Sequence, residues 1–148
     1  MPCRSGRTRI DHMKRLMIVD EDVDALESLK LLLESYYDIC LTRTGAECLM
    51  EMDSGFRPDA ILLELGKPTV DESALLAELK RRGARIPVLV LSAQPDAEEK
   101  ARELGLHAVL RRPFTYEQLK EKVEQVLKGP GGSPARKGFL AGFILVVG

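Results

Sequence analysis

The sequence predicts an α/β fold in which one parallel, doubly wound sheet carries helices on both of its faces. Short apolar runs alternate with segments of helical periodicity five times along the chain, which is the pattern of consecutive βα units. The connections between them are short, and right-handed crossovers then build a single sheet. Functional sites of such sheets form at the carboxyl ends of the strands, near the point where the strand order reverses.

Each expected strand is a short apolar run bounded by polar or turn residues. The third of them, "AILLE", is apolar on both faces, as a central parallel strand must be when helices cover both of its sides. The second, "YDICLT", is more polar and is expected to be less buried. The five strands are predicted at residues 15–19, 37–42, 60–64, 87–92 and 108–111.

The expected helices show apolar residues at helical spacing and recognisable ends. Thr44, with Glu47 three residues later, has the spacing of a capping box, and Thr115 is placed to cap the last helix. Gly83 and Gly105 follow the third and fourth helices as terminators. The five helices are predicted at residues 23–35, 44–52, 71–82, 96–105 and 115–128.

The flanks of this pattern differ in composition from the predicted domain at residues 13–128. Residues 1–12 are basic and are expected to be a disordered extension or the result of a misplaced start codon. Residues 129–138, "GPGGSPARKG", read as a flexible linker. Residues 139–148, "FLAGFILVVG", form an apolar tail, which either docks on the domain or a partner, begins a longer segment, or is an artefact.

Composition narrows the class of protein. The formal net charge of −1 argues against nucleic acid or an anionic membrane surface as the partner. No apolar run reaches the length of about 20 residues that spans a bilayer, and the basic N-terminus lacks the apolar centre of a secretory signal. The three cysteines show no metal-binding spacing and are expected to be reduced thiols. We therefore expect a cytoplasmic protein.

Polar side chains follow four of the five expected strands, so they should converge at one edge of the sheet. Asp22 alone would be explained as the first turn of a helix, where negative charge is favourable. The other carboxylates repel one another, so Mg²⁺, an arginine or protonation must compensate them. The polar residues at the strand ends are Asp20, Glu21, Asp22, Glu64, Ser92, Arg111 and Arg112.

Four segments in this order resemble the receiver domain of bacterial response regulators, similar to the chemotaxis receiver. They are "LMIVDED", "PDAILLELGKPTVDE", "IPVLVLSA" and "GLHAVLRRPF", and the resemblance covers about residues 13–128. It implies a flavodoxin-like (βα)5 receiver fold with strand order 2-1-3-4-5. It also implies a role in two-component, phosphorelay signal transduction.

The resemblance assigns the metal and phosphoacceptor positions. The family's acidic pair, which binds Mg²⁺, falls on Asp20 and Glu21, and its metal-binding backbone carbonyl falls on Gly66. The aspartate that takes a phosphoryl group from a histidine kinase falls on Glu64. Asp59, at the start of the same strand, is about 16 Å from the active edge and cannot replace it. Because Glu64 replaces the family's aspartate beside this metal position, Mg²⁺ binding is possible but expected to be weakened.

The resemblance also assigns the switch positions. The hydroxyl of the switch falls on Ser92, and the aromatic residue that couples to it falls on Val109, which has no ring to turn. The lysine that contacts the phosphoryl group falls on Arg112. The family's cis peptide bond falls between Arg112 and Pro113.

These substitutions predict an atypical, stand-alone pseudo-receiver that acts by protein–protein interaction. Glu64 has one methylene more than aspartate and would act as a phosphomimetic group. Guanidinium binds carboxylate bidentately, so we expect Glu64 to pair with Arg112, Ser92 or both and to hold the domain in one state. We expect no catalytic residue and no enzyme.

The partner surface implied by the resemblance is the face made by the fourth helix, fifth strand and fifth helix, residues 96–127. A histidine kinase is the candidate partner and a homodimer is left open. An alternative is a Mg²⁺-dependent phosphoacceptor or phosphoryl-transfer protein that is still active at the acidic pocket. A nucleotide or flavin binder fits poorly, since the loop "DEDVD" is acidic and lacks a glycine-rich phosphate cradle.

Overall fold

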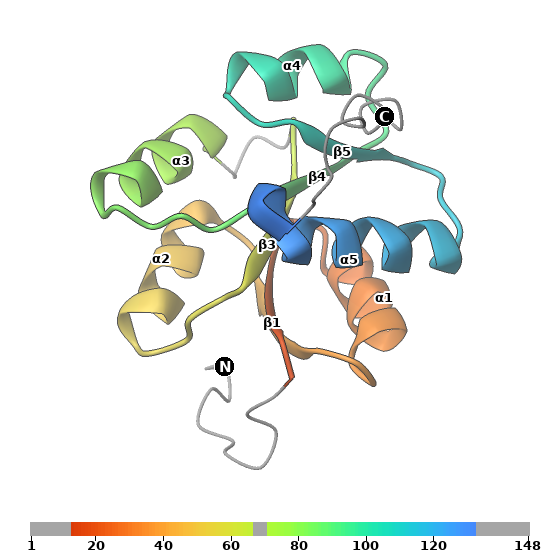
Figure 1. The fold of residues 1–148 in the computed structure, drawn as a ribbon, viewed down its shortest axis with the longest axis horizontal. Coiled ribbons are helices and arrows are strands. Elements are labelled where there is room, and N and C mark those ends of the chain that lie inside the picture. The colour runs from red at the N-terminus through yellow and green to blue at the C-terminus, as the bar shows by residue number, and fades with distance from the viewer. Residues whose placement is uncertain (1–12, 67–70, 133–148) are drawn as a thin grey trace.

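A computed structural model describes residues 13–66 and 71–132. Within these residues the chain forms a five-stranded sheet in the order β2-β1-β3-β4-β5, with every neighbouring pair parallel. The predicted topology is therefore confirmed (Figure 1). The strands are β1 (Arg15–Val19), β2 (Asp38–Thr42), β3 (Ala60–Glu64), β4 (Val88–Ser92) and β5 (Ala108–Arg111).

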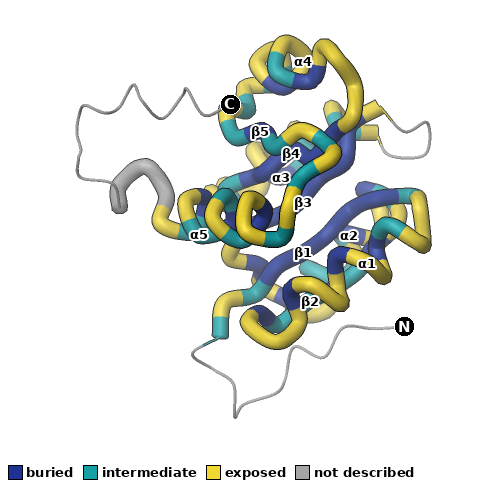
Figure 2. The backbone as a smooth tube through the Cα atoms, turned by 90° about the vertical axis from the view of Figure 1, so that its right-hand side faces the viewer, coloured by how far each residue is buried: buried dark blue, intermediate teal, exposed yellow. Residues whose placement is uncertain are grey.

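Helices cover both faces of the sheet and create two separate cores. One core is formed by the sheet with the second, third and fourth helices, and the other by the sheet with the first and fifth. Figure 2 shows that the buried strands lie between the helices, whose outward sides are exposed. The helices are α1 (Val23–Leu33), α2 (Gly45–Asp53), α3 (Glu72–Arg81), α4 (Ala97–Glu103) and α5 (Tyr116–Gly132).

The helix starts follow from local hydrogen bonds of polar side chains. Asp22 caps α1 by accepting the backbone N–H groups of Asp24 and Ala25, as expected of a first-turn carboxylate. Thr115 and Gln118 form a reciprocal capping pair at the start of α5, because each side chain accepts the other's backbone N–H.

The expected capping box of α2 is formed only in part. The Thr44 hydroxyl accepts the Glu47 N–H, as predicted. The Glu47 carboxylate, however, accepts the N–H of Arg43 at 2.8 Å, one residue before the cap. The Thr44 backbone is fully extended there, which places the preceding N–H within reach of the carboxylate. The Thr44 and Glu47 side chains therefore bind backbone groups both in the first turn of α2 and in the residue before its cap.

The C-terminal boundary of the domain differs from the prediction. Helix α5 continues to Gly132, so residues 129–132 of the expected linker are helical. Glycine and proline are poor helix formers, but propensity is a weak guide to the last turn of a helix whose preceding turns are packed. The rest of the expected linker, the apolar tail and the N-terminal extension lie outside the described residues.

The cysteines match the expectation of reduced thiols only in part. Cys48 is a buried free thiol. Burial disfavours the charged thiolate and raises the pKa of Cys48 to about 12. Cys40 is disulfide-bonded. The expectation of a reduced thiol is therefore wrong for Cys40, because the spacing of cysteines along the chain does not show whether one of them is oxidised. In the described part of the chain, none of the helices has the length and apolar character that crossing a membrane requires.

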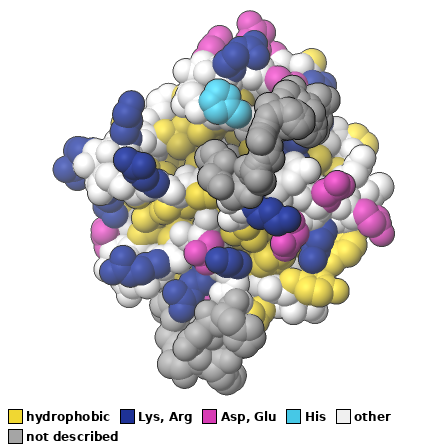
Figure 3. Space-filling view, viewed as in Figure 1, with side chains coloured by type: hydrophobic (Ala, Val, Ile, Leu, Met, Phe, Trp, Pro, Cys, Tyr) yellow, Lys and Arg dark blue, Asp and Glu magenta, His cyan; other side chains and the backbone are white. Residues whose placement is uncertain are grey.

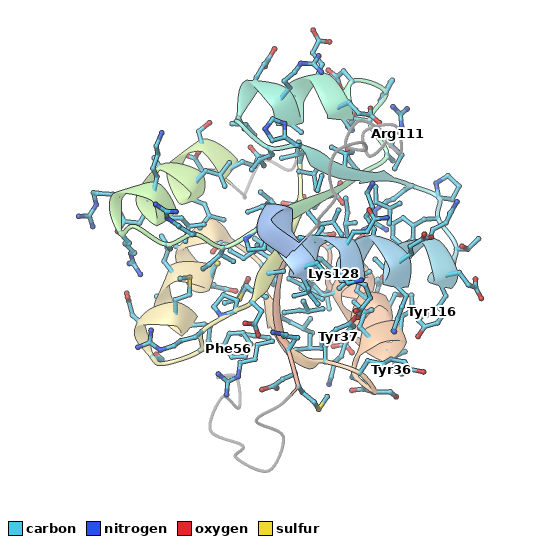
Figure 4. All side chains as sticks on the ribbon, in the orientation of Figure 1. Tyr36, Tyr37, Phe56, Arg111, Tyr116 and Lys128 are labelled. Atoms are coloured by element: carbon cyan, nitrogen blue, oxygen red, sulfur yellow. The ribbon has the colours of Figure 1, made fainter. Side chains whose placement is uncertain are left out.

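Tyrosines join α5 to the turn after α1. The Tyr37 hydroxyl donates a hydrogen bond to the Glu124 carboxylate, and the Lys120 ammonium lies 4.4 Å from the centre of the Tyr36 ring. Figure 4 shows Tyr36, Tyr37 and Tyr116 together where α1 and α5 lie side by side. Burial and the hydrogen bond to Glu124 raise the pKa of Tyr37 above its ordinary value.

We expect Tyr37→Phe to lower the free energy of unfolding by about 1 kcal/mol near neutral pH, the usual net worth of one hydrogen bond. The folded state holds the Tyr37 proton more tightly than the unfolded chain, whose tyrosines ionise near pH 10. Native stability should therefore fall above about pH 10, and the variant should lose less there. Urea unfolding at pH 7 and pH 11 measures both effects. Tyr36→Phe is the control, and equal alkaline losses in all three proteins would contradict the prediction.

Candidate functional site at the carboxyl edge of the sheet

The strand register brings the predicted site residues together. Val19 pairs with Leu63, so the next residues, Asp20 after the end of β1 and Glu64 at the end of β3, lie at the same level of the sheet. Ser92 pairs with Arg111, which places Arg112 one residue beyond the end of β5. The carboxyl ends of β1, β3, β4 and β5 therefore converge, as the alternation of βα units predicts.

Asp20 is the most buried carboxylate of the acidic run. Its side chain is 3% exposed, and its Oδ1 accepts the backbone N–H of Asp22 at 3.0 Å. Glu21 is half-buried, and its backbone carbonyl accepts a hydrogen bond from the Arg43 side chain. Asp22 turns to α1 as its cap. The run "DED" is thus divided between the pocket and the helix start.

Glu64 and Arg112 form an ion pair in this pocket. Arg112 Nε donates to Glu64 Oε1 at 3.3 Å, and the Glu64 side chain is only 8% exposed. The predicted contact between these two residues is therefore present. Its expected bidentate form is wrong, because Nη2 of Arg112 lies 3.9 Å from Asp20 Oδ2 and makes no hydrogen bond. The guanidinium lies between two carboxylates on different strands, so it cannot align both nitrogens with one of them.

Backbone and ring contacts hold Arg112 in that position. Its N–H donates to the Ser92 carbonyl at 2.9 Å, which continues the pairing of β5 with β4 by one residue. Its guanidinium carbon lies 5.3 Å from the centre of the Phe114 ring. The Arg112–Pro113 peptide bond between them is cis, as predicted. Sequence reasoning missed the role of Phe114, although "RRPF" places it two residues from the arginine.

Ser92 is completely buried at the end of β4. Its hydroxyl oxygen accepts the backbone N–H of Gln94 at 3.1 Å, so it shapes the start of the following loop. A pocket of about 200 Å³ opens beside it. The pocket is lined by Leu65, Gly66, Ser92, Gln94, Asp96, Ala97 and Lys100.

The loop after β3 is held by a side chain that sequence reasoning did not assign to the site. Gly66 has a φ of 90°, a conformation that favours glycine, and its N–H donates to Glu72 Oε2 at 2.8 Å. Glu72 thereby joins the end of β3 to the first turn of α3. Residues 67–70 between them lie outside the described residues. The position of a side-chain acceptor six residues away in sequence carries no recognisable local signal.

The structure also places Val109 and Asp59, two further residues considered in the sequence analysis. Val109 is buried in the middle of β5 and belongs to the core shared by the sheet with α2, α3 and α4. Asp59 lies at the opposite edge of the sheet, where its carboxylate accepts the Arg15 N–H at 2.8 Å. Asp59 therefore fastens the start of β3 to β1, consistent with its exclusion as a phosphoacceptor.

The residues predicted to bind Mg²⁺ do not form a site suited to the ion in this arrangement. One Asp20 oxygen accepts a backbone N–H, and the other lies 3.9 Å from the buried Nη2 of Arg112, so a positive charge already faces this carboxylate. Among the described residues, no group of three or more His, Cys, Asp or Glu side chains is placed to hold a metal. The positive charge opposite Asp20 and Glu64 is supplied by the protein itself.

Comparison with known proteins places this geometry in context. The model of the response regulator receiver domain matches residues 16–124. Transcriptional regulatory protein CiaR of Streptococcus pneumoniae is 32% identical over 121 residues, which cover 80% of this chain and 54% of CiaR. Transcriptional regulatory protein PrrA of Mycobacterium tuberculosis is 31% identical over 122 residues, which cover 80% of this chain and 52% of PrrA. The chain thus spans about half the length of these relatives.

Solved structures show the same fold at low sequence identity. The chemotaxis response regulator CheY4 of Vibrio cholerae superposes with a TM-score of 0.66 at 19% identity, covering 77% of this chain and 98% of CheY4. A receiver domain protein from Clostridium thermocellum gives a TM-score of 0.68 at 19% identity, covering 78% and 95%. The five parallel strands, the polar residues at their carboxyl edge and these matches lead to one conclusion: the chain belongs to the response regulator receiver domain family of two-component signalling.

Proposed function

We propose that this chain is an atypical receiver in which Glu64 stands at the phosphoacceptor position and acts as a constitutive phosphomimetic group. The observation that carries the proposal is the contact between Glu64 and Arg112, 3.3 Å apart at the end of the sheet. It joins β3 to β5 without any phosphoryl group. Since a receiver signals by changing the contacts at this edge, a contact that needs no phosphorylation supports a domain held in one state.

Two further features support a fixed state. Val109 is a buried aliphatic residue at the position where the family has a mobile aromatic ring, so it offers no two-position element for a switch. The Ser92 hydroxyl oxygen accepts the Gln94 N–H and is completely buried. A bistable element is what a signal must bias, and neither residue provides one.

The phosphoryl transfer expected of the family is disfavoured by the residues at two positions, Glu64 and Arg112. In an aspartate receiver, a carboxylate oxygen attacks the phosphorus of the donor. The bond from phosphorus to the donor atom breaks, a nitrogen in phosphohistidine or an oxygen in acetyl phosphate, and the donor leaves with that electron pair. The longer Glu64 side chain moves its oxygens away from the line of attack, and Arg112 engages both carboxylates of the pocket. We therefore propose a binding protein and not an enzyme.

We propose that output occurs by protein–protein contact through the face of α4, β5 and α5, residues 96–127. The charges there are partly paired within the domain, for Arg111 contacts Glu98 at 2.8 Å. On the part of the surface that Figure 3 shows uncovered, basic and acidic side chains are mixed with apolar ones, which supports a protein partner over nucleic acid. A histidine kinase is one candidate partner, and homodimerisation is another use of the same face.

The large exposed apolar side chains of the described residues lie elsewhere, on α1, α2 and the turn after α1. They are Val23, Leu31, Leu32, Tyr36 and Met50. Charge-reversing substitutions on α4 and the single change Leu31→Ala therefore separate two candidate faces. Loss of partner binding by the α4 variants alone supports the proposed face, and loss by Leu31→Ala alone contradicts it.

Stand-alone action and cytoplasmic localisation complete the proposal. Immunoblotting of a fractionated native lysate tests both. A soluble cytoplasmic species of the length of this chain supports them. A species about twice as long, in keeping with the length of the curated relatives, would contradict stand-alone action.

The test of the phosphomimetic role compares phosphorylation of three proteins: the native chain, Glu64→Asp, and the double variant Glu64→Asp with Arg112→Lys. Each is incubated with acetyl phosphate and Mg²⁺ and measured by intact mass. We expect no added phosphoryl group on the native chain and one on the double variant, with acetate released and the group mapping to residue 64. Glu64→Asp alone should gain less, since Arg112 still engages Asp20.

Asp59→Asn is the control for mapping, since Asp59 lies at the opposite edge of the sheet and should not change the result. Phosphorylation of native Glu64 would overturn the proposal in favour of a working phosphoacceptor. An inert double variant would show that more of the pocket than these two positions has diverged. The domain would then be treated as a binding scaffold with no signalling state encoded at Glu64.

A further inference from the structure

We infer that the guanidinium of Arg112 replaces the divalent cation of the acidic pocket, so that this domain keeps its buried carboxylates compensated without a metal. The inference concerns ion binding. It goes beyond the proposed signalling role and holds whether or not Glu64 fixes the signalling state.

The first support is the reach of Arg112 across the sheet. It leaves the end of β5 and directs Nε to Glu64 on β3 and Nη2 to the residue that follows β1, Asp20, at 3.3 and 3.9 Å. One planar group therefore faces two carboxylates from two different strands. Positive charge beside these carboxylates is what a bound dication would supply.

The second support is the state of the Nη2 atom. It is buried and has no hydrogen-bond partner, and it is the only such side-chain nitrogen or oxygen found among residues 13–66 and 71–128. A guanidinium could form a better hydrogen bond by turning to solvent or by forking onto Glu64 alone. Its position is instead explained by the electrostatic attraction of both Glu64 and Asp20, each of which is nearly buried.

The third support is that Arg112 is held in place by contacts that do not involve the carboxylates. Its backbone N–H is bonded to the Ser92 carbonyl, and the Phe114 ring lies against the guanidinium. A dication entering beside Asp20 would meet this fixed positive charge at close range. Binding of a metal would therefore require Arg112 to leave the pocket.

The test is calorimetric titration of Mg²⁺ and, separately, Mn²⁺ into three chains. Arg112→Met keeps most of the side-chain length and removes the charge. Arg111→Met is the matched control, because Arg111 precedes it on β5 and pairs outward with Glu98. We expect Arg112→Met to bind either ion about tenfold more tightly than the native chain or Arg111→Met. Adding Asp20→Asn to Arg112→Met should abolish the gain.

A second variant keeps the inference testable if Arg112→Met does not fold. Arg112→Lys retains a positive charge but replaces the planar, forked guanidinium with a compact ammonium, which covers less of the space between the two carboxylates. It should also gain metal affinity over the native chain, and circular dichroism reports whether each variant is folded. The inference is overturned if the native chain binds Mg²⁺ as tightly as the variants. It is equally overturned if folded Arg112 variants gain no more than Arg111→Met.

Discussion

Arg112→Ala should lower the free energy of unfolding by about 2 kcal/mol near neutral pH. Removing one partner of a fully buried ion pair costs about 3–5 kcal/mol, because the remaining charge stays desolvated. The Glu64 and Asp20 carboxylates are nearly buried, but the Arg112 side chain is 30% exposed, so solvent reduces the effect. Urea unfolding followed by circular dichroism measures it.

The control for this prediction is Arg111→Ala. Arg111 Nη1 lies closer to its carboxylate, 2.8 Å from Glu98 Oε1, but both side chains are more than a third exposed. Its loss should cost about 0.5 kcal/mol or less. Glu64→Gln combined with Arg112→Ala should be more stable than Arg112→Ala alone, because one stranded charge is removed. Equal costs for Arg111→Ala and Arg112→Ala would show that the pocket carboxylates do not depend on Arg112.

Phe56→Ala is expected to cost about 3–5 kcal/mol, the largest effect of any single change considered. Phe56 is 1% exposed in the connection from α2 to β3 and packs into the core beneath α2, α3 and α4. Its backbone N–H donates to the Glu51 carbonyl, which holds the Phe56 backbone at the end of the helix (Figure 4). Truncation leaves a cavity that this surrounding structure cannot close.

Met50→Ala is the matched control for Phe56→Ala. Met50 lies on α2, six residues earlier, but is 63% exposed, so its truncation should change stability by less than about 0.5 kcal/mol. Thermal and urea unfolding of the two variants test the contrast directly. Similar midpoints for both would mean that the Phe56 side chain does not contribute to the core.

Local signals in the sequence were sufficient to predict the fold. The five apolar runs match the strands within one residue at each end, and the alternation of strand and helix predicts the parallel sheet that is observed, while its order was implied by the family resemblance. Phe56 shows the limit of this reasoning. It lies alone between Gly55 and Arg57, outside any periodic segment, so nothing local marks it as one of the most buried side chains.

The candidate site was predictable as a set of positions but not as a set of contacts. Parallel strands end at a common edge, so Asp20, Glu64, Ser92 and Arg112 had to converge. Which oxygen each nitrogen meets depends on side-chain conformation in three dimensions. The chain alone therefore did not reveal that Arg112 is shared between Glu64 and Asp20, nor that Glu72 holds the Gly66 N–H.

The sequence by itself determined the order of the elements and the polar edge, because hydrophobic periodicity and strand-end residues act locally along the chain. Its four motifs indicated the family through their resemblance to receiver domains. The tertiary structure decided how charge is balanced in the pocket, how Tyr37 is joined to Glu124 across 87 residues, and that α5 continues to Gly132. These features depend on groups that are distant in sequence and adjacent only after folding. Their energies arise from burial and geometry, which a linear pattern does not contain.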